Sequence, residues 1–178
     1  YFYTRMGLTR STLSSSSAAS EVYKRPTNDL ILSIEHFGST SIKGLASKPT
    51  IDIMIEVASF NNEVKQLITQ KLETIGYGNM YNAEQENKIT FCKGYGENYG
   101  RIQTYHVHIR EKGDLPQDEI LFRNCLRKNS DFCDKYAELK YALAKKYEFN
   151  REQYTQGKTD FIVRISKHEK LSLNENQI

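Results

Sequence analysis

A loop of small residues followed directly by an apolar strand pattern is the feature that most constrains this chain. Residues 38–49 contain two glycines, three serines and a threonine, and residues 50–57 are mainly apolar. A run this short is typical of a buried strand rather than a core helix. Successive strand side chains alternate between faces, so Asp52, Met54 and Glu56 are predicted to share one face.

Hydrophobic periodicity predicts the other elements. Strands are expected at residues 30–37, 88–93 and 101–110, and the last two form an antiparallel hairpin. Helices are expected between Asn61 and Gly76 and at residues 118–128, 131–147 and 151–166. The apolar positions of the first helix are Val64, Leu67, Ile68, Leu72 and Ile75, and the aromatic core candidates of the later helices are Phe122, Tyr147, Phe149 and Phe161. The prediction is an α+β fold, a small mixed sheet flanked by helices, with a helical C-terminal half.

The length of 178 residues predicts one domain that can bury its own core. Residues 1–28 are predicted to be a weakly specified lead-in, because residues 11–20 hold six serines, with one short helix around residues 18–23. The domain is expected to span residues 29–168, and residues 169–178 to form a tail.

Composition excludes several classes of protein. The net charge of +3 is too small for a protein that wraps a polyanion, so nucleic acid is not an expected partner. No apolar run is long enough to span a bilayer and no signal-peptide pattern is found, so a cytoplasmic protein without a membrane partner is expected. Three cysteines without metal-ligand spacing predict reduced, structural thiols: Cys92, Cys125 and Cys133.

The loop at residues 38–41 has the chemistry of a phosphate site. Glycine lets the backbone approach phosphate oxygens, and serine and threonine hydroxyls donate to them. The predicted phosphate-binding residues of this loop are Gly38, Ser39, Thr40 and Ser41. An ordinary turn is the alternative interpretation.

Asp52 and two later histidines form the candidate metal site. A carboxylate in an apolar strand must be hydrogen-bonded, paired or metal-bound, which makes Asp52 the catalytic candidate. His106 and His108 share one strand face about 6.6 Å apart. With Asp52 they could ligate Mg²⁺, Mn²⁺ or Zn²⁺. The alternative is a pair of half-buried histidines bonded to their neighbours.

The chain resembles the GrpB family in several motifs that occur in the same order. The first is His-x-Gly-Ser-Thr-Ser-x-x-Gly-Leu-x-x-Lys-Pro-x-x-Asp-Ile, and the matching segments are residues 36–53, 106–108, 121–127, 136–140 and 154–162. The resemblance implies the fold of nucleotidyltransferases related to DNA polymerase beta. Active members of that superfamily carry an Asp-x-Asp or Asp-x-Glu pair, and here only Asp52 matches it, because Thr50 and Met54 are not carboxylates.

Positive side chains are the remaining ligand candidates. Lys48 ends the small-residue loop, and Arg123, Lys140 and Lys158 lie on the later helices. A phosphorylated ligand needs such groups to neutralise its charge. Solvated helix faces are the alternative.

These residues, together with the resemblance to the GrpB family, imply a nucleotidyltransferase-like protein that binds a nucleotide or another phosphorylated small molecule and that could hold a divalent metal. Two other functions stay open. A metal-dependent phosphoesterase would use the same Asp–His set to activate water. A noncatalytic binding or regulatory module would keep the pocket without the chemistry.

Overall fold

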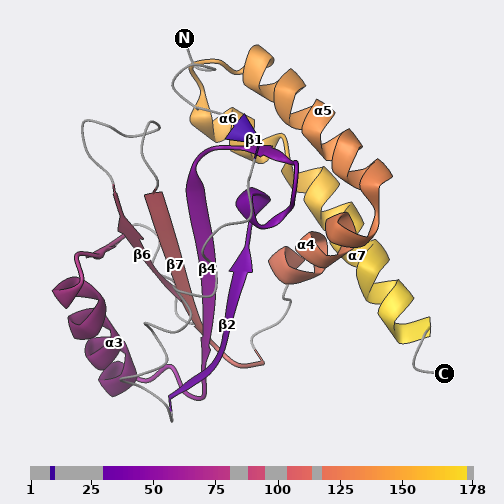
Figure 1. Ribbon diagram of the computed structural model, residues 1–178. Helices are drawn as coiled ribbons and strands as arrows, with labels where there is room; N and C mark the ends of the chain where they lie inside the picture. Colours follow the sequence, from indigo (N-terminus) through magenta and orange to yellow (C-terminus); the bar gives the residue numbers. More distant parts are fainter. Residues whose placement is uncertain (1–8, 11–29, 81–87, 95–103, 114–117, 176–178) are drawn as a thin grey trace. The chain divides into compact units, whose positions relative to one another are not determined.

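The computed structural model describes residues 9–10, 30–80, 88–94, 104–113 and 118–175 (Figure 1). The chain divides into two compact units. The sheet unit holds described residues 30–37, 50–80, 88–94 and 104–113, and the helical unit holds residues 9–10, 38–49 and 118–175. The short helix predicted around residues 18–23 lies outside the described residues.

The sheet unit is built on five strands in the order β2-β4-β7-β6-β5. The strands are β2 (Ile31–Phe37), β4 (Thr50–Val57), β5 (Gly78–Asn79), β6 (Lys88–Lys93) and β7 (Thr104–Glu111). Strands β4 and β7 are parallel and every other pair is antiparallel. The mixed sheet and the β6–β7 hairpin of the α+β prediction are therefore confirmed.

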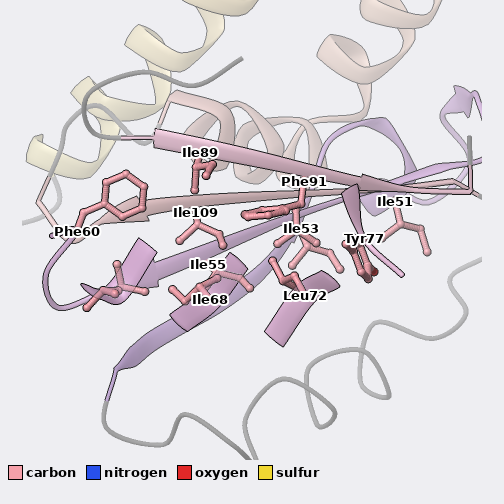
Figure 2. Packing of buried hydrophobic residues seen from close by; sticks show 13 residues of the cluster. Ile51, Ile53, Ile55, Phe60, Ile68, Leu72, Tyr77, Ile89, Phe91 and Ile109 are labelled. Carbon is pink, nitrogen blue, oxygen red and sulfur yellow. The ribbon is translucent and has the colours of Figure 1, made fainter. Parts of the chain in front are cut away.

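Helix α3 (Asn62–Thr74) covers one face of this sheet. The Asn61 side chain accepts a hydrogen bond from the Val64 amide at 3.0 Å and so caps the helix. The buried side chains of α3 are Val64, Ile68 and Leu72, and they belong to the same core cluster as Ile53 and Ile55 (Figure 2). Leu67 and Ile75, predicted for the same stripe, are 37% and 39% exposed and lie outside it.

The alternation of strand side chains gives the sheet two chemically different faces. Ile53 and Ile55 of β4 and Val107 of β7 lie in the core cluster with α3. The intervening residues project to the opposite face, as predicted. On that face the register pairs Asp52 with His106.

The helical unit confirms the helical C-terminal half. Its elements are β1 (Thr9–Arg10), η1 (Ser39–Ser41), β3 (Ala46–Ser47), α4 (Asp118–Lys128), α5 (Ser130–Lys146), α6 (Arg151–Gln156) and α7 (Thr159–Glu175). Strands β1 and β3 pair antiparallel. A second core cluster joins the loop to the helices, and its buried residues are Ile42, Leu45, Phe122, Cys125, Leu126, Tyr136 and Ile165.

The prediction of a single helix at residues 151–166 is wrong, because the chain forms two helices there, α6 and α7. Gly157 follows α6, and a Cβ at that position would lie 2.6 Å from Leu143 Cδ2. A larger residue at the break would therefore displace the Leu143 side chain of α5. Helix α7 also continues through most of the predicted tail, and Phe149, predicted as core, is 84% exposed because it lies in the turn before α6.

No helix among the described residues combines the length and the apolar character needed to cross a membrane.

Candidate functional site

Asp52 and His106 meet across the parallel strands β4 and β7. The two residues are register partners, and Asp52 Oδ1 lies 3.0 Å from His106 Nδ1. Both side chains are partly exposed, at 24% and 17%. The pair is therefore accessible from solvent while its geometry is fixed by the sheet.

His108 completes the group two residues further along β7. One ligand atom from each of Asp52, His106 and His108 lies within 4.8 Å of the others. Thr90 Oγ1 lies 3.1 Å from His108 Nδ1, and the Phe37 ring contacts the His108 ring edge-on at 5.2 Å between centroids. The structure thus brings together the three residues that the sequence predicts as candidate metal ligands.

The electrostatics of this group favour a neutral imidazole. Burial, followed by the charge of Lys88, lowers the pKa of His108 to about 4. Neutral imidazole is the form that binds a metal ion. With Nδ1 turned toward Thr90, the Nε2 atom of His108 remains for a ligand, and such a partner fixes the ring orientation.

The donor set fits one divalent ion with imidazole affinity. Two imidazoles and one carboxylate suit Zn²⁺ or Mn²⁺, whereas Mg²⁺ prefers oxygen ligands. Glu56 does not supply a second carboxylate to the group. Its Oε2 accepts from the Ser33 hydroxyl at 2.7 Å, and its Oε1 lies 3.6 Å from Arg110 Nη2.

Two neighbours of this group were not recognised as site residues in the sequence. Thr90 contacts His108, and Cys92 is the register partner of His106 on the antiparallel strand β6. Directly paired residues project to the same face, so the Cys92 thiol lies on the side of the sheet that carries the group. Alternation along residues 88–93 was the signal that could have found both.

Lys140 is the central residue of a second group, in the helical unit. Its side chain comes from α5 and is 4% exposed. Its Nζ donates to the Ser39 hydroxyl at 3.0 Å and to the carbonyl of Ala46, and it lies 5.4 Å from the Tyr136 ring centroid. Burial, followed by the charge of Lys158, lowers the pKa of Lys140 to about 7.

Further cations surround Lys140. Burial, Arg151 and Lys158 together lower the pKa of Lys48 to about 8. The Nζ of Lys158 lies 4.6 Å from the Tyr154 ring centroid. An anion among these side chains would offset their mutual repulsion.

The small-residue loop is held by its own hydrogen bonds. Gly38 has φ 72, a conformation that favours glycine. The Ser41 hydroxyl donates to the Gly38 carbonyl at 2.6 Å, and Ser41 is 1% exposed. Arg127 donates to the Ser41 carbonyl from Nε and Nη2 at 3.1 and 2.8 Å. Thr40 is half-buried beside them.

Arg123 differs from the other predicted cations. It is 6% exposed, and its Nε and Nη2 donate to Asn124 Oδ1 at 3.0 and 2.8 Å. The structure therefore brings Ser39 together with Lys140, Lys48 and Lys158 in the helical unit. Asp52, His106 and His108 form a separate group in the sheet unit.

Comparisons with known proteins identify relatives. A family model described as "GrpB protein" matches residues 11–168. A UPF0157 protein of Pseudomonas aeruginosa is 37% identical over 75% of this chain and 54% of its own length, so the chain spans about half of that relative. The glutamate-rich protein GrpB of Alkalihalophilus pseudofirmus is 33% identical over 74% of this chain and 75% of its own length.

Two solved structures resemble this chain to different degrees. The crystal structure of the conserved protein GrpB from Enterococcus faecalis overlaps 91% of this chain and 96% of its own with a TM-score of 0.75 and 28% identity. A cytoplasmic RNA terminal U-transferase overlaps 75% of this chain and 41% of its own with a TM-score of 0.49 and 18% identity. At the latter level of similarity nothing follows about the activity of this chain.

Proposed function

Because the chain belongs to the GrpB family and gathers Asp52, His106 and His108 into one group, we propose that it is a metal-dependent, nucleotidyltransferase-like protein that binds a nucleotide or another phosphorylated ligand. The observation that carries the metal part is the approach of the three ligand atoms to within 4.8 Å. Asp52, His106 and His108 would hold the ion. When bound, a divalent ion supplies Lewis acidity toward a phosphoryl group.

The lysine group supports the phosphorylated ligand. Lys48 and Lys158 supply positive charge, as does Lys140 in its protonated form, and burial makes an anionic partner favourable for each ammonium that is kept from water. Ser39 adds a hydroxyl that contacts Lys140 directly. The Gly38 backbone, Thr40 and Ser41 shape the loop that carries Ser39, and Arg123 is held beside Asn124 on α4.

A metal-dependent phosphoesterase is the second candidate function. The ligand group has one carboxylate and two imidazoles, rather than the carboxylate pair associated with two-metal transfer. An imidazole-rich set favours Zn²⁺ or Mn²⁺, metals that serve hydrolysis with water as the acceptor. A noncatalytic binding module is the third candidate function. The feature that favours it is the lack of an Asp-x-Asp pair in the sequence.

Metal titration tests the first part of the proposal. Protein stripped with a chelator should bind one Zn²⁺ or Mn²⁺ more tightly than Mg²⁺ in isothermal calorimetry. Asp52→Asn and His106→Ala should abolish that binding. Matched controls are Asp131→Asn, an exposed carboxylate on α5, and His168→Ala, a histidine on α7, and both should bind metal as the wild type does. Equal binding by all variants would contradict the site.

Nucleotide binding and turnover test the second part. ATP, GTP, CTP and UTP are screened by thermal shift with and without the bound metal, since a ligand that binds the folded state raises its melting temperature. Products are then followed by phosphorus NMR. Transfer to a second substrate supports the transferase, release of phosphate to water supports the phosphoesterase, and binding without turnover supports the module. No thermal shift with any nucleotide would contradict the proposal.

A further inference from the structure

The contact between Ser39 and Lys140 has the geometry of a nucleophile and its base. Lys140 Nζ lies 3.0 Å from Ser39 Oγ, and the same Nζ donates to the Ala46 carbonyl. Lys140 is 4% exposed, whereas Ser39 is only half-buried. The amine is therefore withdrawn from water, while the hydroxyl that it contacts stays within reach of a ligand.

The surroundings of Lys140 favour the neutral amine. Burial disfavours the ammonium most, followed by the charge of Lys158; Cys133 acts in the opposite direction and Lys48 adds a smaller repulsion, so that the pKa of Lys140 is lowered to about 7. A neutral amine has two N–H donors and one lone pair. The Ala46 carbonyl accepts one N–H, and the lone pair can accept the Ser39 hydroxyl proton.

We propose that Ser39 and Lys140 form a serine–lysine pair in which Ser39 Oγ attacks a phosphorus centre and Lys140 Nζ takes its proton. Serine needs such an adjacent base, and lysine serves as one in other serine enzymes. The choice of phosphorus as the electrophile rests on the proposed function. It agrees with the cations Lys48 and Lys158, which would offset the charge of phosphoryl oxygens.

The step balances without an external reagent. The Ser39 O–H bond breaks and its proton moves to Lys140 Nζ, which becomes an ammonium. One O–P bond forms at Oγ, and the bond from phosphorus to the leaving group breaks with its electron pair. The ammonium then returns the proton to the leaving group or to solvent, which regenerates the amine.

Ser41 is not an equivalent nucleophile. Its hydroxyl donates to the Gly38 carbonyl, and its side chain is 1% exposed. The serine–lysine pair therefore assigns different roles to two serines of the same loop. Peptide mapping can separate them.

A fluorophosphonate probe tests the pair without a known substrate. The probe forms an O–P bond and expels fluoride, so intact mass spectrometry should show one adduct and peptide mapping should place it on Ser39. The labelling rate should rise with pH and level off above about 7, as Lys140 loses its proton. Ser39→Ala should abolish the adduct, and Lys140→Met should slow labelling at least about 100-fold, the usual contribution of a general base.

Lys140→Arg separates a base from a positive charge. Arginine keeps the charge but offers no lone pair, so it should label as slowly as Lys140→Met while still binding inorganic pyrophosphate. The matched control is Lys135→Met, a solvent-exposed lysine of α5 that pairs with Asp131, and it should label at the wild-type rate. Labelling that is absent in the wild type, or unchanged by both Lys140 substitutions, would overturn the pair.

Ser39→Cys keeps the test decisive where a Lys140 variant fails to fold. The thiol stays next to an intact Lys140, and an adjacent amine that accepts its proton should bring the alkylation midpoint with iodoacetamide below about 8.5, the ordinary pKa of cysteine. A midpoint at or above 8.5 would overturn the pair. Calorimetry with pyrophosphate is read separately: labelling without binding contradicts the proposed function, and binding without labelling contradicts only the pair.

Discussion

The two groups of candidate site residues have opposite electrostatic character. In the sheet unit, Asp52 and His106 are complementary partners on neighbouring strands. In the helical unit, Lys140, Lys48 and Lys158 are like charges, and two of them are desolvated. The first group is suited to a cation and the second to an anion. Perturbing each group alone should therefore remove one kind of ligand and leave the other.

The largest effect is expected from Asp52→Asn. Loss of the carboxylate removes one of the three proposed ligands and the only negative charge of the group, so affinity for Zn²⁺ should fall by about 100-fold or more, beyond the 10–100-fold typical of an outer partner. Competition with a chromogenic chelator measures this. Binding of pyrophosphate to the metal-free protein should stay at the wild-type value, and a parallel loss would show that the two groups are not independent.

The second effect is a pH dependence of stability that comes from Lys140. Its folded pKa is about 7 and its ordinary value is 10.5, so between these values the unfolded chain binds more protons. The free energy of unfolding should therefore rise with pH above 7, by at most about 1.4 kcal/mol per pH unit from this group. Urea denaturation at pH 6, 7, 8 and 9 measures it.

Lys140→Met should remove that part of the slope, since no proton is then exchanged at position 140. Lys135→Met, on the exposed side of α5, should keep the wild-type slope. A slope that is the same in all three proteins would mean that Lys140 is not the titrating group. A bound anion should flatten the slope as well, because it favours the ammonium.

The sequence predicted the sheet unit better than the helical unit, for physical reasons. Strand alternation at residues 104–111 is a local property, so the shared face of His106 and His108 followed directly from it, and Asp52 was expected as the third ligand from across the sheet. The burial of Lys140 depends on how α5 packs against the loop, and the residues that surround it are distant in sequence. A charged helix position carries no local sign of such burial.

The break between α6 and α7 likewise depends on a contact that the local sequence does not reveal. The apolar spacing of residues 151–166 is helical, and a glycine at position 157 alone does not end a helix. Gly157 packs closely against Leu143, which lies on another helix, and this contact cannot be read from residues 151–166 alone. Phe149 likewise fits an apolar helix position in the sequence, yet its place between α5 and α6 leaves it in solvent.

Gly157→Ala is expected to have an intermediate effect, confined to the helical unit. The added Cβ would lie 2.6 Å from Leu143 Cδ2 and 3.1 Å from Cδ1, so the leucine must shift within a buried cluster. Overpacking of this kind usually costs about 1–3 kcal/mol of unfolding free energy. Urea denaturation should show that loss, with weaker pyrophosphate binding and unchanged zinc affinity. Gly78→Ala is the comparison, since a Cβ at Gly78 would meet nothing within 4 Å and Gly78 is not among the glycines with positive φ.

Asn61→Ala is the smallest of these perturbations and acts on the sheet unit. The substitution removes the side-chain acceptor of the Val64 amide at the start of α3, which should cost about 1 kcal/mol. Asn61→Asp keeps an acceptor and should retain most of the stability. Hydrogen exchange should show faster opening of α3 in Asn61→Ala, with the amides of α5 and α7 unchanged. Equal acceleration in all three helices would mean that the two units unfold together, and the contrast between their sites would then be one of chemistry alone.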